Sequence, residues 1–188
     1  MNGARAFSTL KRTALLAIGL SLPLVAKAQT VDSSKVNDLL KETKTHAVLA
    51  EDDAQTLDAY TRSKLSWQSH ATRVHEMKEH ANDLIRDFNQ LSSMRGDASP
   101  WQQEAIDRIN PLLQEMAAHL TATINHLNDN QSRTHLPQYQ QYVHANRELM
   151  VKTARLISEF ADYSEAKTVA NELEKKLELP TVAREGDE

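Results

Sequence analysis

Apolar residues recur every three or four positions through most of this chain, which is the spacing of an α-helix buried along one side. The clearest stretch covers residues 74–91, where charged side chains occupy the other faces of the helix. Such a helix cannot bury its apolar stripe alone, so partner helices are expected. The stripe consists of Val74, Met77, Ala81, Leu84, Phe88 and Leu91.

The next helix has the clearest beginning in the chain. Ser99 is suited to the N-cap position and Pro100 to the first helical position, and Gln102 stands where a capping box needs it. The apolar period then predicts a helix over residues 100–127. Pro111 lies inside this helix, so a kink is expected there.

Two turns are predicted on either side of that helix. Gly96 is expected to end the preceding helix as a C′ glycine, and residues 128–132 are rich in turn-forming Asn and Asp. A last helix is predicted from Pro137 to about Leu177, because Pro180 cannot continue it.

The region before the strong stripe predicts two helices with a break between them. A short helix is expected over residues 34–49 and a second over residues 53–94. Extending the stripe backwards through one helix would place His46 and Asp53 in core positions, which favours the break. One continuous helix over residues 34–94 stays open as an alternative, because no glycine or proline interrupts this segment.

These elements predict an all-α fold: an up-down antiparallel helical bundle of three long helices plus a short N-terminal helix. With only 4 glycines and 5 prolines among 188 residues, the composition also favours helix. A single bundle domain is expected over residues 29–180, followed by an acidic disordered tail at residues 181–188.

The first 28 residues have the pattern of a cleavable export signal peptide. Residues 1–28 combine a basic start, an apolar run over residues 13–25 and an Ala-Lys-Ala cleavage site. The run is shorter than the about 20 residues of a transmembrane helix. The mature chain is therefore expected to have no membrane span and a periplasmic or secreted location.

Charge and cysteine content narrow the classes of function. Four of the 22 basic residues and none of the 26 acidic ones lie in the leader, which leaves the mature part with a formal charge of −8. This charge argues against nucleic acid as a partner. The chain has no cysteine, so thiol nucleophiles, thiolate metal sites and covalent haem attachment are excluded.

No pattern of catalytic residues is present, so the protein is not expected to be an enzyme. Residues 75–80 read HEMKEH, but a zinc protease helix needs its two histidines four positions apart, whereas His75 and His80 are five apart. Glycine-rich phosphate loops and a nucleophile elbow are also missing from the sequence.

Aromatic and histidine side chains are expected to gather at one end of the bundle. Counting from the predicted turns places them at a similar level, where they form a candidate site for an apolar or planar ligand. Large amphipathic rings that simply fill a widening bundle end are the alternative. The candidate ligand-binding residues are Trp67, His70, His126, Tyr139 and Tyr142.

Methionines define a second candidate site, for a metal ion or haem. The same counting brings Met77, Met116 and Met150 to one layer, with His119 one turn away. Thioethers and an imidazole are ligands for copper(I), and a His/Met pair is a ligand set for b-type haem. Methionine filling irregular gaps near Pro111 is the alternative.

Together these patterns predict an exported, non-enzymatic helical bundle without a cofactor, which acts by binding a partner protein or a small ligand. The alternative is a periplasmic bundle that binds copper or b-type haem through the His and Met side chains named above.

Overall fold

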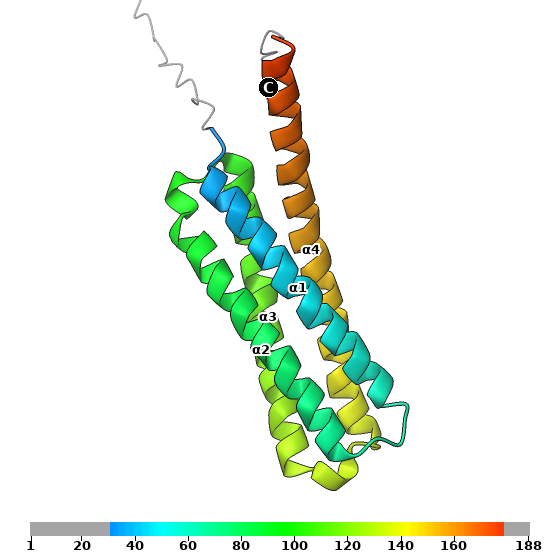
Figure 1. The fold of residues 1–188 in the computed structure, drawn as a ribbon. Coiled ribbons are helices and arrows are strands. Elements are labelled where there is room, and N and C mark those ends of the chain that lie inside the picture. The colour runs from blue at the N-terminus through cyan, green and yellow to red at the C-terminus, as the bar shows by residue number, and fades with distance from the viewer. Residues whose placement is uncertain (1–30, 179–188) are drawn as a thin grey trace, which may run out of the picture.

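A computed structural model describes residues 31–178 and confirms the all-α prediction. Four helices pack side by side, and a short 3₁₀ turn precedes each of the last two (Figure 1). The predicted leader and the predicted acidic tail lie outside the described residues. The elements are α1 (Ser34–Tyr60), α2 (Trp67–Ser93), η1 (Arg95–Asp97), α3 (Pro100–Asp129), η2 (Gln131–Arg133) and α4 (Pro137–Lys176).

Polar contacts show how the helices are paired. Asp32, just before α1, pairs with Lys167 near the end of α4, whereas Asp58 at the end of α1 pairs with His144 near the start of α4. The two helices therefore run in opposite directions. The core between the helices is continuous along the bundle, and its largest fully buried apolar side chains are Leu40, Leu57, Met77, Leu84, Leu91, Ile109, Met116, Tyr139, Met150 and Ile157.

The predicted break near residue 51 is wrong. The first helix continues through this acidic segment to Tyr60, and the second begins at Trp67, so the connection covers residues 61–66. The first helix is thus as long as the second, at 27 residues each. The alternative of one uninterrupted helix over residues 34–94 is also wrong.

Ion pairs explain why the first helix tolerates a carboxylate in the core. Asp53 is only 3% exposed, and its two carboxylate oxygens lie 2.6 Å from Arg73 and 2.7 Å from His80, both on α2. A buried charge is stable when opposite charges and hydrogen bonds surround it. His46 is also partly buried and lies 3.5 Å from Asp87 of α2.

The capping residues in the sequence predicted the start of α3 correctly. The helix begins at Pro100, and the Gln102 side chain accepts a hydrogen bond from the Ser99 N–H at 2.9 Å, as the capping box predicts. The helix continues through Pro111 to Asp129. At the preceding turn, however, Gly96 lies within the 3₁₀ turn η1 instead of ending α2 as a C′ residue.

The fourth helix extends beyond the other three. It has 40 residues, and its last turns project past the bundle as the orange to red segment of Figure 1. Every residue from Thr168 to Glu178 is exposed. Among residues 31–178, no helix has both the length and the apolar composition that crossing a membrane requires.

Candidate functional site

The structure brings most of the predicted aromatic residues together at the end of the bundle where α1 turns into α2 and α3 turns into α4. The His70 ring lies edge-on to Tyr139, with centroids 5.4 Å apart, and His126 stacks on Tyr139 at 6.1 Å. Tyr142 lies 5.0 Å from His126, and Tyr60 extends the cluster on the other side of His70 at 5.8 Å. We call this end the turn end.

A cavity of about 380 Å³ lies beside this cluster, between the two turns. Trp67, the first residue of α2, lines it together with His70, so two of the five predicted ligand-binding residues face it. Tyr139 and Tyr142 are not among its walls. The lining residues are Ser63, Lys64, Leu65, Ser66, Trp67, His70, Gln131, Ser132, Thr134 and His135.

One buried polar pair forms the inner wall of the turn end. The Nδ1 atom of His70 lies 3.2 Å from the hydroxyl of Tyr139, and the two residues are 1% and 0% exposed. Burial lowers the pKa of His70 and raises the pKa of Tyr139, so both side chains are neutral at pH 7. The contact fixes the His70 ring, which also lines the cavity.

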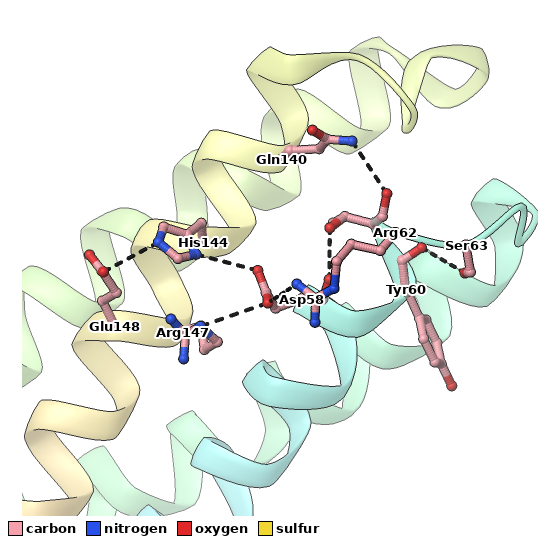
Figure 2. A network of polar contacts seen from close by, with 9 residues as sticks. Asp58, Tyr60, Arg62, Ser63, Gln140, His144, Arg147 and Glu148 are labelled. Carbon is pink, nitrogen blue, oxygen red and sulfur yellow. Dashed lines mark hydrogen bonds and ion pairs between the residues drawn. The ribbon is translucent and has the colours of Figure 1, made fainter.

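A network of charged side chains holds the α1–α2 turn in place (Figure 2). Asp58 accepts a hydrogen bond from Arg62 at 2.6 Å and also lies 3.5 Å from His144 and 3.8 Å from Arg147 on α4. Burial opposes the charge on Asp58, but Arg62 and then His144 and Arg147 keep its pKa below the usual value. The carboxylate therefore links the end of α1 to α4.

Gln140 provides a second link between the two turns. Its side-chain amide donates to the Thr61 carbonyl at 3.3 Å, which is the dashed line from Gln140 in Figure 2. It also donates to the His135 carbonyl at 3.5 Å. One side chain thus joins the turns that form the opposite walls of the cavity. The cavity is therefore held between connected segments.

The charge of the lining differs from that of the whole chain. Lys64 contributes a cation, His70 and His135 contribute imidazoles, and none of the ten lining residues, all in the described part of the chain, carries a carboxylate. Ser66 and Trp67 also place the N-terminus of α2 at the wall, where the helix dipole favours negative charge. The cavity combines an indole face with groups that attract an anion.

The residues of the predicted metal or haem site are placed in the core or beside it. Met77, Met116 and Met150 are at most 1% exposed and belong to one apolar cluster, while His119 is half-buried. The His119 carbonyl accepts hydrogen bonds from Thr123 and Asn146. Copper or haem binding by these residues stays a prediction.

Sequence reasoning missed the histidine–aspartate pairs between the helices. His80 appeared to belong to a solvated face, yet it pairs with Asp53, and His144 similarly pairs with Asp58. Their partners lie on other helices, so no spacing within one helix reveals them. Across residues 31–178, no group of three or more His, Asp or Glu side chains is arranged to hold a metal ion.

No protein-family model, curated protein or solved structure matches this chain. Its function is therefore inferred from the geometry of its own side chains.

Proposed function

We propose that this chain is an exported, non-enzymatic binding protein that holds a small planar ligand with a negative group in the turn-end cavity. The observation on which the proposal rests is the composition of this cavity, where Trp67, one lysine and two histidines meet without a carboxylate. Its volume of about 380 Å³ lies at the lower end of the range of about 300–1,000 Å³ that is usual for small-molecule sites.

Each wall supports one part of the ligand's chemistry. The indole of Trp67 offers a flat apolar surface for a ring, and Lys64 and the start of α2 attract a carboxylate. His70 is neutral and held by Tyr139, so it forms a rigid part of the wall. An aromatic carboxylate combines these features.

The export leader supports a role outside the cytoplasm. Residues 1–28 have the three parts of a signal peptide, and the absence of cysteine makes the chain independent of the redox state of its compartment. We therefore place ligand binding in the periplasm or in the secreted fraction.

Tryptophan fluorescence tests this proposal directly, because Trp67 begins α2 at the turn end, whereas Trp101 lies in the first turn of α3 at the opposite end. The variant Trp101→Phe leaves only Trp67, and Trp67→Phe leaves only Trp101. Titration with benzoate should change the emission of Trp67 in a saturable way and leave that of Trp101 unchanged. Benzamide and benzylammonium, which lack the negative group, should bind less tightly.

Two lysine variants provide the matched control. Lys64→Gln removes the cation at the cavity and should weaken benzoate binding about two- to five-fold, as expected for an exposed charge pair. Lys78→Gln removes an exposed lysine three turns along α2 and should have no effect. Binding that is insensitive to Lys64, or an equal response of both tryptophans, would refute the proposal, as would no saturable binding of any of the three probes.

A further inference from the structure

The projecting end of α4 carries an apolar face that the rest of the described chain does not cover. Tyr163, Val169, Leu173 and Leu177 are between 46% and 61% exposed. The first three belong to α4, which continues past its neighbours (Figure 1), and Leu177 is the C-cap residue of this helix. Exposed apolar groups in a row of this length mark a surface for association.

The apolar positions on this segment follow a heptad pattern. Leu156, Tyr163, Ala170 and Leu177 are seven residues apart, and Ala166 and Leu173 follow Tyr163 and Ala170 by three positions. This three-four alternation is the seam of a two-stranded coiled coil. The seam lies almost entirely on the part of α4 that extends past the bundle.

The seam continues from a groove between α3 and α4. This groove has a volume of about 310 Å³, and four apolar or aromatic side chains and two charged ones line it. These are Trp101, Leu156, Phe160 and Tyr163, with Arg108 and Glu159. Leu156 and Tyr163 belong to both the groove and the seam. Tyr163 packs edge-on against Trp101, with ring centroids 5.0 Å apart, so the beginning of the seam is anchored to the bundle.

We propose that a second copy of this chain covers the seam, with the two α4 ends antiparallel over residues 166–177. Placing Ala170 opposite Leu173 of the second copy also places Ala166 opposite its Leu177. Every small residue then meets a large one. A parallel pair would instead put alanine opposite alanine and leucine opposite leucine, which fills space less well.

Charge complementarity supports the same alignment. Lys167 and Glu174 occupy equivalent positions on one flank of the seam, and flanking positions of this kind face each other in an antiparallel pair. Lys167 of each copy therefore meets Glu174 of the other. A shift by one heptad would bring Lys167 opposite its own counterpart, which is unfavourable.

One further property favours a second copy as the occupant. Residues 165–178 contain four acidic and three basic residues, so this segment is nearly neutral although the mature chain is acidic. Within its own chain, Lys167 lies 2.9 Å from Asp32. The contact spans only about 18 Å of helix, so the dimer should be weak and concentration-dependent.

Sedimentation equilibrium of the purified chain from micromolar to millimolar concentration tests this proposal. The wild type should form dimers as the concentration rises, and Leu173→Glu should weaken dimerisation by about ten-fold or more. Leu49→Glu is the matched control, because Leu49 is a similarly exposed leucine on α1. Circular dichroism should show the same helix content for all three proteins.

Charge reversal tests the orientation. Lys167→Glu and Glu174→Lys should each weaken the dimer, and the double variant should restore it, because both intermolecular pairs reform with reversed sign. A parallel dimer would not be restored in this way. The proposal is overturned if the wild type stays monomeric at every concentration, if Leu49→Glu acts like Leu173→Glu, or if the double variant remains as weak as the single ones.

Discussion

The two ends of this bundle contain similar aromatic side chains, but they differ in how far the tyrosine is buried. Each end has one tryptophan and a tyrosine of α4: Trp67 and Tyr139 at the turn end, and Trp101 and Tyr163 at the end where α4 projects. Tyr139 is 0% exposed, whereas Tyr163 is 46% exposed. At the turn end the connections close over the helices, and at the projecting end α4 continues without neighbours.

This difference shows that the connections, more than the side chains, decide what each end can do. The two connections at the turn end flank a cavity that opens to solvent, which suits a small molecule. Continuation of α4 leaves a long apolar seam, which suits another helix. A chain with few apolar residues and no cysteine can therefore present two different kinds of binding surface.

The largest expected difference between the ends is in stability. Tyr139→Ala should lower the free energy of unfolding by about 3–5 kcal/mol, because it leaves a cavity and removes the partner of His70. Tyr163→Ala should lower it by less than about 1 kcal/mol, because half of this ring already contacts solvent. Urea unfolding followed by circular dichroism measures both values, and equal losses would mean that the two ends are packed alike.

A smaller difference is expected in the dependence of stability on pH. The carboxyl pKa is lowered at both ends: at Asp58 burial is outweighed by Arg62, His144 and Arg147, and at Asp32 it is outweighed mainly by Lys167. A lowered pKa in the folded state means that the stabilisation is present above the unfolded pKa of about 4 and is lost as the pH falls through the folded value.

Asparagine variants separate the two contributions. At pH 7, Asp58→Asn should lower the free energy of unfolding by about 2 kcal/mol and Asp32→Asn by about 1 kcal/mol, because Asp58 has more charged partners. Both differences from the wild type should shrink as the pH is lowered towards 2. A constant difference across this range would show that hydrogen bonding, not charge, accounts for the effect.

The sequence predicted those parts of the fold that depend on local signals. Ser99, Pro100 and Gln102 define the start of α3 within four residues of the chain, so the boundary could be placed correctly. The end of α1 could not, because Asp53 is acceptable in the core only through Arg73 and His80 of the next helix. When the burial of a charged residue depends on partners far away in the sequence, the local pattern of apolar positions does not reveal it.

The sequence predicted the candidate site only in part, because some of its residues lie on helices near turns and others lie in the connections themselves. Trp67, His70 and Tyr139 lie close to turns, so counting from the turns brought them to one end of the bundle. Lys64 and His135 were missed, because residues in a connection have no helical period that shows where they point. The contact of Trp101 with Tyr163 joins different helices and was missed as well.

The smallest expected effect concerns the projecting end itself. Leu173→Ala should change the free energy of unfolding by less than about 0.5 kcal/mol, because this side chain is 51% exposed and packs on no other helix of the described chain. In the wild type, amide hydrogen exchange over residues 165–178 should become slower as the protein concentration rises, since pairing of two seams protects this segment. Exchange around Met150, in the closed part of the bundle, should not depend on concentration.

If Leu173→Ala destabilised the bundle by more than about 1 kcal/mol, the seam would pack within its own chain. If exchange at the projecting end were the same at every concentration, the contrast between a closed end and an associating end would fail.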